Sequence, residues 1–457
     1  MPTNFMHQAN YLLSNLLSLK SYVLLPIIIF CFSLIFRLPV RKAVKSSLTI
    51  GIGFIGIFII FGYFVARIAP AVESLLKRTG LHFNVLDVGW PPLAAVTWSF
   101  KFVSILIPLI MVVNILMLVF RKTRTFNIDI WNYWHFIFAG MLVYDATHSA
   151  LWSIAAVLIS SVVIIKIADW SAEGVKRFAG LEGISIPTLS AAVYYPVGVL
   201  GDRLLEKIPG IRSLQANPES LKKRLGLLGE PMIIGLMMGL ALGIGAGYSI
   251  KKILELGFEV AAVIYILPMM TSILGQGLNG ISEGMKTFIK SKFPNVGETY
   301  IGLDVAVIVG NTSIIVTGLL LMPVALILAF ALPGIRFIPL GDLANVVCPV
   351  ALIVVATRGN IVRSFILGIP VIIGKLYAAS YMAPVYTRLA RNAHVSLNGY
   401  HGVITGFLDG GNLFRVWLLN IFQGHLWAWI ALPFVALALY FSRPRQSDRA
   451  EANNLNL

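Results

Sequence analysis

The sequence predicts an all-α polytopic membrane protein of about 11 transmembrane helices, with re-entrant hairpins, half-helices and an inverted internal repeat. Composition is the first observation: 58% of the 457 residues are hydrophobic and 12% are charged, and many apolar runs reach about 20 residues, the length that crosses a bilayer. The second is a set of motifs that return in the second half of the chain. The third is a group of apolar segments that are too short or too broken to cross.

The expected spans follow the apolar runs along the chain. They are residues 21–36, 47–68, 101–120, 130–149, 150–168, 228–249, 253–275, 314–332, 343–357, 360–383 and 426–442. The first run resembles a secretory signal, but it has no small-residue cleavage site and basic residues from Arg37 to Lys45 follow it. We therefore expect an uncleaved first span.

Basic clusters predict the orientation. They fall on one side of the expected spans, at residues 37–45, 121–124, 203–224, 286–292 and 443–449, with Lys251, Lys252, Arg388 and Arg391 as exceptions. The positive-inside rule places that side in the cytoplasm, the N-terminus outside and the C-terminus inside. Because most basic residues lie in short loops, the net charge of +16 indicates contact with anionic lipid rather than nucleic acid.

Four motifs recur in the same order. Leu86-Asp87-Val88 matches Leu303-Asp304-Val305, Pro108 matches Pro323, Asp129 to Asn132 matches Asp342 to Asn345, and Ala146-Thr147 matches Ala356-Thr357. An odd number of spans separates the copies, so they must enter the membrane from opposite sides. We expect a first repeat at residues 1–225, an inverted second repeat at 226–420, and a last span with a cytoplasmic tail at 421–457. Repeated halves are typical of a carrier whose substrate site lies between them.

Four apolar segments are interrupted by Gly and Pro, at residues 84–97, 182–200, 300–313 and 400–414. Broken backbone at membrane depth persists only where protein shields it or where it lines a wet cavity. Its free N–H and C=O groups suit hydrogen bonding to polyols and sugars. These segments are the expected re-entrant hairpins and half-helices, with the first hairpin near residues 182–200 in the first repeat and the second near 400–414 in the second repeat.

Asp87 and Asp304 are the strongest candidates for substrate binding, because each occupies the same place in its repeat and a carboxylate at membrane depth is costly. An ionised Asp holds a polyol by accepting two hydroxyl protons. The alternative is that each caps its own half-helix. Asn132 and His135 lie on one helical face beside tryptophans that suit a sugar ring, although a lone His on an apolar helix is more often a core residue.

Further candidates are weaker. Glu182 and Glu230 precede helices and are either ligands or first-turn caps; Asn311 and Thr312 offer an amide and a hydroxyl. Asp145 and His148 suggest an internal salt bridge, and the stretch from Asp409 to Asn412 a hairpin turn. Cys31 and Cys348 are expected to be buried. The sequence contains no phosphate-binding Gly-rich loop, nucleophile–base pair or metal cluster, so we expect no cofactor and an external energy source.

These residues lie in segments that resemble the membrane-embedded IIC component of the galactitol branch of the bacterial sugar phosphotransferase system, in the ascorbate/galactitol superfamily. The segments are residues 85–91 (VLDVGWP), 129–135 (DIWNYWH), 181–187 (LEGISIP), 229–231 (GEP), 301–304 (IGLD) and 341–344 (GDLA). The resemblance adds Trp90 to the substrate-binding candidates. One position departs from the pattern: residue 188 is Thr, where galactitol members are expected to have His, which leaves another polyol or a pentitol open.

The resemblance implies a homodimer in the inner membrane, an elevator-type movement of a core domain, and uptake of galactitol or a related polyol. It also implies cytoplasmic IIA and IIB partners, with IIB donating phosphate from a cysteine, so that this chain carries no phosphoryl group itself. Two alternatives remain at this point: an ion-coupled secondary transporter with Asp87 or Asp304 as the coupling site, and a membrane enzyme or structural component without a transport role.

Overall fold

The computed structural model describes residues 21–79, 84–129, 132–212, 214, 230–292, 299–339, 341–393 and 402–444. Each of the eleven expected spans overlaps a helix in it. These helices are α2 (Ser21–Ile35), α3 (Val40–Thr79), α5 (Val103–Val119), α6 (Tyr133–Thr147), α7 (Ala150–Ala179), α12 (Pro231–Gly245), α13 (Ile250–Lys292), α15 (Thr312–Ala331), α16 (Val347–Ala356), α17 (Ile361–Asn392) and α19 (Leu426–Phe441).

Shorter elements lie between these helices. The helices are α4 (Trp90–Trp98), α8 (Leu189–Ala192), α9 (Tyr195–Leu205), α10 (Pro209–Arg212), α14 (Ala306–Val309), η3 (Leu343–Val346) and α18 (Leu413–Phe422). The strands are β1 (Val85–Asp87), β2 (Thr125–Asn127), β3 (Ile184–Ser185), β4 (Tyr300–Gly302) and β5 (Val403–Thr405).

The helices support a polytopic membrane protein. Within the described residues, α7, α15 and α17 are each long and apolar enough to cross a bilayer, and several shorter apolar helices accompany them. Pro92–Trp98 and Val103–Val119 form a pair bent by 91°. That bend falls directly after the expected broken segment at residues 84–97.

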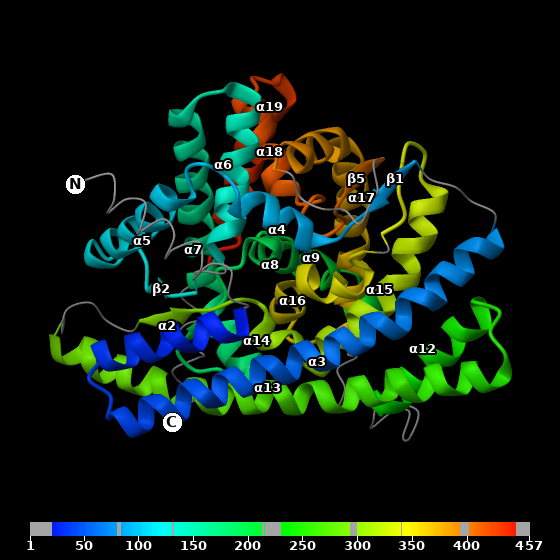
Figure 1. Cartoon of the computed structure of the whole chain (residues 1–457), viewed down its shortest axis with the longest axis horizontal. Coiled ribbons are helices and arrows are strands. Elements are labelled where there is room, and N and C mark those ends of the chain that lie inside the picture. The colour runs from blue at the N-terminus through cyan, green and yellow to red at the C-terminus, as the bar shows by residue number, and fades with distance from the viewer. Residues whose placement is uncertain are drawn as a thin grey trace.

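Four helices, α2, α3, α12 and α13, form a layer of long rods along one edge of the molecule (Figure 1). Small residues allow close packing: a Cβ atom on Gly277 of α13 would lie 2.9 Å from the carbonyl oxygen of Ser46 on α3, and one on Gly239 of α12 would lie 2.6 Å from that of Leu256. Helices α3 and α13 have 40 and 43 residues, more than the spans expected at 47–68 and 253–275. Hydropathy detects only the apolar middle of each rod, and the helix continues through its charged ends.

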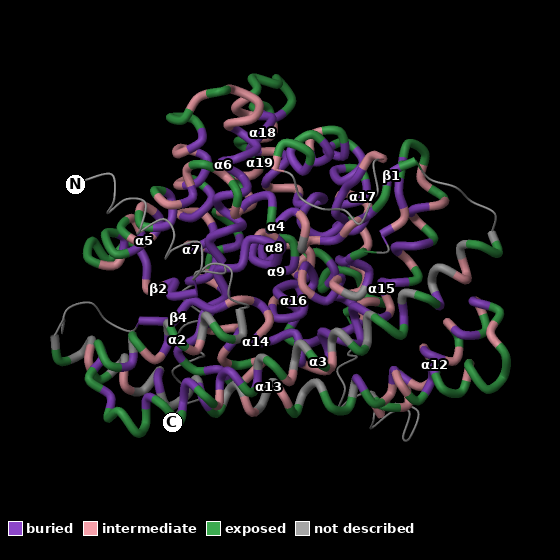
Figure 2. The backbone as a smooth tube through the Cα atoms, viewed as in Figure 1, coloured by how far each residue is buried: buried purple, intermediate pink, exposed green. Residues whose placement is uncertain are grey.

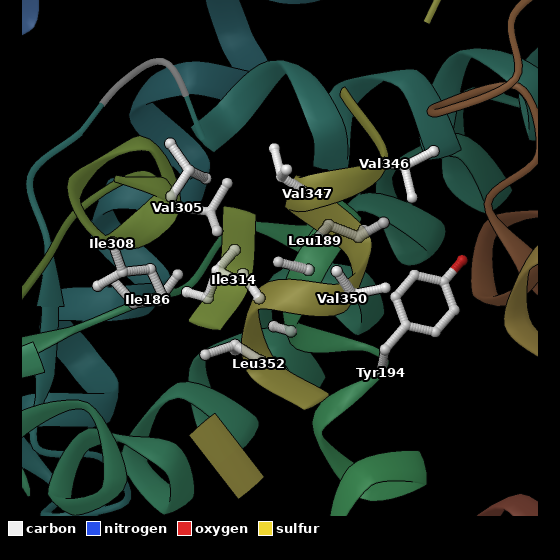
Figure 3. Close-up of a cluster of buried hydrophobic side chains, with 14 of the residues drawn as sticks. Ile186, Leu189, Tyr194, Val305, Ile308, Ile314, Val346, Val347, Val350 and Leu352 are labelled. Carbon is white, nitrogen blue, oxygen red and sulfur yellow. The ribbon is translucent and has the colours of Figure 1, made fainter. Parts of the chain in front are cut away.

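The remaining elements pack into a body whose interior holds most of the buried residues (Figure 2). Its core contains Leu189 of α8, Val305 beside α14, and Val347 and Val350 at α16, all nearly inaccessible to solvent. Figure 3 shows these side chains in one apolar cluster. Because Thr188 precedes Leu189 and Asp304 precedes Val305, this cluster fixes the backbone of both polar residues.

The five strands correct the expectation of an all-α fold. They form two small parallel sheets, β1–β5 and β2–β4–β3. Each strand belongs to one of the broken segments or follows α5, where free N–H and C=O groups would otherwise be left unpaired in a dry interior. Pairing between strands from distant parts of the chain satisfies them.

The pairing crosses between the two halves of the chain. Strand β1, near the start of the first half, pairs with β5, near the end of the second, in the register Asp87 to Thr405. Strand β4, which follows α13 in the second half, pairs with β3, which follows α7 in the first, in the register Ile301 to Ile184. Each half therefore supplies a strand that completes the other half's hairpin.

Candidate substrate site

Asp304 lies at the junction of the two halves, two residues after β4. Its Oδ1 accepts the N–H of Ala306 at 2.9 Å, and its Oδ2 lies 3.0 Å from the hydroxyl of Thr188. The same hydroxyl lies 2.8 Å from Oδ1 of Asn132 and accepts the N–H of Val305 at 2.8 Å. The structure thus brings two predicted residues, Asp304 and Asn132, together through Thr188.

Thr188 has one hydroxyl proton and two acceptors within reach. A hydroxyl group donates a single hydrogen bond, so when Thr188 donates to Asn132 it cannot also donate to Asp304. At any moment, therefore, either Oδ1 of Asn132 or Oδ2 of Asp304 receives no hydrogen bond from the Thr188 hydroxyl. Asn132 and Thr188 are buried, whereas Asp304 is only half-buried. Chemically, this arrangement offers an acceptor to a ligand hydroxyl.

Further polar groups, hydrogen-bonded to Asp304 and Asn132, orient this cluster. Asp129 accepts the N–H of Asp304 at 3.0 Å, and Nδ2 of Asn132 donates to Oδ1 of Asn127 at 3.2 Å. Asn114 in turn accepts the N–H of Asn127 and donates to the carbonyl of Thr125. The amide of Asn132 is consequently held in one orientation, with Oδ1 towards Thr188.

Asp87, in the first copy of the repeated Leu-Asp-Val motif, has different surroundings. Its Oδ1 accepts the N–H groups of Gly89 at 3.1 Å and Phe407 at 3.0 Å, and its Oδ2 accepts that of Asp342 at 3.3 Å. Only 5% of Asp87 is exposed. Its carboxylate ties the end of β1 to the loop after β5, and Gly89 turns the chain there with a φ of 72° that favours glycine.

Asp342, in the other half of the chain, adds hydrogen bonds to the same connection between the segments after β1 and β5. Its Oδ1 accepts the N–H of Trp90 and an amide proton of Asn345, at 3.1 and 3.0 Å, and its Oδ2 accepts the N–H of Leu408 at 3.1 Å. Gly341 brings the two backbones close, since a Cβ atom there would lie 2.5 Å from the carbonyl oxygen of Asp87. Backbone donors therefore surround both carboxylates.

His135 points to the second hairpin. Its Nδ1 lies 3.1 Å from Oδ1 of Asp409, and the ring of Trp134 stacks on it with centroids 4.1 Å apart. Arg415, whose side chain is inaccessible, donates to the carbonyl and the carboxylate of Asp409. Lys375, equally inaccessible, donates to the carbonyl of Leu408 at 2.6 Å and lies 3.3 Å from the hydroxyl of Tyr194.

Sequence reasoning missed Lys375 and Arg415 as members of this network, and noted Thr188 only as a departure from the family pattern. A signal existed for the two cations, because single charges within apolar helices are costly and usually have a function or a partner. The departure at position 188 marked this threonine, but nothing in the sequence indicated that its hydroxyl would contact Asn132 and Asp304. It is important because strand pairing brings it beside Asp304.

The other predicted residues lie apart from this cluster. Trp90 is half-buried, with its ring 6.4 Å from that of Trp134. Asn311 accepts the N–H of Ser313 at 2.9 Å and begins α15, of which Thr312 is the first residue. Glu182 has a side chain that is 59% exposed, 3.6 Å from Lys176. Glu230 begins α12, in the layer of long helices.

Two smaller expectations are wrong. Asp145 forms its salt bridge with Arg388 of α17 instead of His148, because His148 ends α6 in a left-handed conformation. Cys31 is exposed on α2 rather than buried, and Cys348 is half-buried on α16. Among the described residues no group of three or more His, Cys, Asp or Glu side chains is placed to hold a metal ion.

Comparison with known proteins identifies the family. A family model described as the sugar-specific permease component of the phosphotransferase system matches residues 15–399. The chain belongs to this family. The permease is 35% identical to the galactitol-specific EIIC component of Escherichia coli K12 over 408 residues, which cover 89% of this chain and 90% of the relative. It is 36% identical over 432 residues to a putative permease IIC component of the same strain, covering 94% and 98%.

Membership confirms the resemblance drawn from the sequence. It also disfavours the ion-coupled alternative, because permeases of this family belong to the phosphotransferase system.

Proposed function

We propose that this permease imports galactitol or a closely related polyol across the bacterial inner membrane, and that a cytoplasmic IIB subunit phosphorylates the polyol as it is released. The family match and the galactitol-specific relative support this proposal. IIA and IIB subunits are the expected partners, because this chain offers no phosphoryl-carrying motif of its own.

The observation that carries the proposal is the group of Thr188, Asn132 and Asp304. A polyol presents a row of hydroxyl groups that donate and accept hydrogen bonds but carry no charge. An ionised carboxylate with an oxygen within reach of a shared hydroxyl suits such a ligand, because hydrogen bonds to charged groups are stronger than those between neutral ones. We infer that Asp304 contacts substrate directly and that Asn132 lies across from it.

The other site residues predicted from the sequence have structural or secondary roles in this proposal. Asp87 holds the two halves together through backbone N–H groups, and His135 holds the second hairpin through Asp409. Trp90, Asn311 and Thr312 lie on elements that flank the cluster and remain candidates for outer hydroxyl contacts. Glu182 and Glu230 rank last, given the exposure of the first and the position of the second in the other layer.

Phosphoryl transfer needs a donor that the partner supplies. The S–P bond of a phosphocysteine on IIB breaks, a P–O bond to a polyol hydroxyl forms, and the cysteine leaves as a thiolate. The proton of that hydroxyl must move to an acceptor, for which Oδ2 of Asp304 is the candidate. The chain therefore holds and polarises the hydroxyl of the polyol, which is the nucleophile. It supplies no nucleophile of its own.

The two-layer architecture suits an elevator-type carrier. In this proposal the long helices α3 and α13 form the stationary, dimerising layer, and the body with its two hairpins moves across the membrane. Repeats at residues 1–225 and 226–420, related by inversion, would give the body two alternative openings. The N-terminus is then outside and the C-terminus, after the last span, in the cytoplasm.

Reconstitution tests the proposal. The permease is placed in vesicles containing labelled galactitol inside or outside, with and without phosphorylated IIB on the cytoplasmic face. We expect phosphorylated galactitol to accumulate on the side of IIB only when the phosphorylated partner is present. Accumulation of free galactitol driven by a proton or sodium gradient, without IIB, would contradict it.

A further inference from the structure

Helix α19 presents an apolar surface along almost its whole length. Ala428 is the single buried residue in this helix of 16 residues, and Phe434 and Phe441 are 67% and 55% exposed. The helix packs against α18 and α9. Helix α9 adds the exposed side chains of Val197 and Leu204, whose spacing places them on one helical face. In a protein that spans a membrane, acyl chains cover a surface of this kind.

Two arginines lie at the C-terminal end of this surface. Arg203 of α9 donates from Nη1 to the carbonyl of Phe441, the last residue of α19. Arg443 follows in the next turn, and its guanidinium lies 5.2 Å from the ring centre of Tyr440 and 5.7 Å from that of Trp170 on α7. Because consecutive Cα atoms are about 3.8 Å apart, the backbone of Arg443 is within about 8 Å of that of Phe441. Both arginines are therefore held at the same end of α19.

The charge of Arg203 is not neutralised by the acidic residues on its own helix turn. Asp202 and Glu206 both pair with Arg363 of α17, at 2.9 and 3.2 Å. The side-chain hydrogen bond of Arg203 goes instead to an uncharged carbonyl group. Within the part of the chain that the structure describes, Arg203 forms no salt bridge. Its positive charge remains without a counter-ion from the protein.

Arg443 is in the same situation. The carboxylates nearest in sequence to the α7 ring on which it lies are those of Asp169 and Glu173. Asp169 pairs with Lys166 at 3.3 Å, and Glu173 pairs with Arg177 at 3.1 Å. Among the described residues, Arg443 forms no salt bridge either. Two uncompensated positive charges therefore lie at the end of an apolar surface.

We propose that Arg203 and Arg443 bind the phosphate of an anionic phospholipid whose acyl chains lie along α19 and α9. The planar fork of arginine binds two phosphate oxygens at once. Trp170 and Tyr440 are of the residue types found at the level of lipid headgroups. Helix α19 is about 24 Å long, which exceeds the roughly 15 Å of hydrocarbon in one leaflet. A headgroup bound here joins α9, which follows the hairpin of the first half, to the last helix.

A lipid suits this surface better than a second copy of the chain does. In a dimer with its two-fold axis along the membrane normal, an interface on α19 would bring the same ends of two copies together. Two further arginines without counter-ions would then enter the same region. An anionic headgroup instead supplies the missing negative charge, and its acyl chains cover the apolar side chains.

Lipid titration followed by native mass spectrometry of the intact permease tests the site. The permease in detergent is titrated with phosphatidylglycerol, with phosphatidylethanolamine, whose net charge is zero, or with inorganic phosphate. We expect wild type to bind phosphatidylglycerol about 10-fold more tightly than phosphatidylethanolamine. Arg203→Gln and Arg443→Gln should each lower the affinity for phosphatidylglycerol about 5- to 10-fold. The control is Arg177→Gln, which removes an arginine already paired with Glu173 and should stay within about twofold of wild type.

Further readouts separate this site from other uses of the surface. Arg443→Gln removes no hydrogen bond of its guanidinium to the protein among the described residues, so it tests binding without loosening the end of α19. Equal affinity of wild type for the two lipids, or an unchanged preference in both variants, would overturn the inference. So would displacement of the lipid by an equal concentration of inorganic phosphate, or a loss of dimers in the variants with lipid binding intact. Galactitol and IIB are absent from these mixtures, so the outcome is independent of the proposed function.

Discussion

The hydroxyl of Thr188 lies 3.0 Å from a carboxylate oxygen of Asp304, a residue 116 positions away in the sequence. This contact joins the hairpin of the first half to the segment after β4 in the second half, at the point where β3 and β4 pair. The same hydroxyl accepts the N–H of Val305. One small side chain thus sets the position of both the backbone and the charge of the candidate site.

Replacing Thr188 by Val tests this joint, because Val keeps the branched shape and removes the hydroxyl. The N–H of Val305 loses its acceptor and Asn132 loses a donor, so we expect the folded state to lose about 1–3 kcal/mol. Thermal unfolding in detergent and galactitol titration should both show the loss. Thr188→Ser, which restores the hydroxyl, should recover most of it; equal behaviour of the Val and Ser variants would contradict this role.

Asp87→Asn should affect stability more than binding. The carboxylate of Asp87 accepts three backbone N–H groups, and an amide NH₂ in its place would face a donor. We expect a cost of about 1–3 kcal/mol from the unsatisfied groups, seen as a lower unfolding temperature. Protein that remains folded should bind galactitol within about threefold of wild type. Unchanged stability with a large loss of affinity would instead make Asp87 a ligand.

Breaking the buried ion pair of Arg415 and Asp409 should lower the stability of the folded state far more than breaking an exposed ion pair. Removing one partner of a buried ion pair costs about 3–5 kcal/mol, because the other charge stays buried. Arg415→Gln should therefore unfold at a much lower temperature than wild type. The control is Arg388→Gln, whose side chain is 53% exposed and whose pair with Asp145 is worth about 0–1 kcal/mol. A similar fall in unfolding temperature in the two variants would contradict this prediction.

The orientation of the long helices can be tested by labelling. Arg78 contacts Gly245 near one end of the α3–α13 pair, and Phe36 packs on Phe288 near the other. Thr79 and Ser291 therefore lie at opposite ends of the layer. After replacing Cys31 and Cys348 by Ala, a cysteine at position 79 should react with an impermeant periplasmic reagent, and one at position 291 should not. Labelling of both from the same side would contradict the proposed topology.

The sequence predicted the helices well because their apolar runs are long and their ends are charged. It missed the strands, because two or three residues such as Ile184 and Ser185 carry no pattern of their own. Their pairing is decided by a partner more than a hundred residues away. The motif repeat singled out Asp87 and Asp304 as candidates for matched positions. It could not predict that Phe407 and Asp342 would surround one carboxylate with backbone donors, while Thr188 faces the other.

The central claim is that Asp304 binds substrate with its charge, and calorimetric titration of folded Asp304→Asn with galactitol tests it most directly. Asparagine keeps the shape and one acceptor, and it caps a turn about as well as aspartate. A hydrogen bond to a charged group contributes about 1.5–3 kcal/mol, so affinity should fall about 10- to 100-fold. The Asp87→Asn variant serves as the matched control. An affinity for galactitol equal to that of wild type would show that Asp304 only shapes the turn, and would contradict the account.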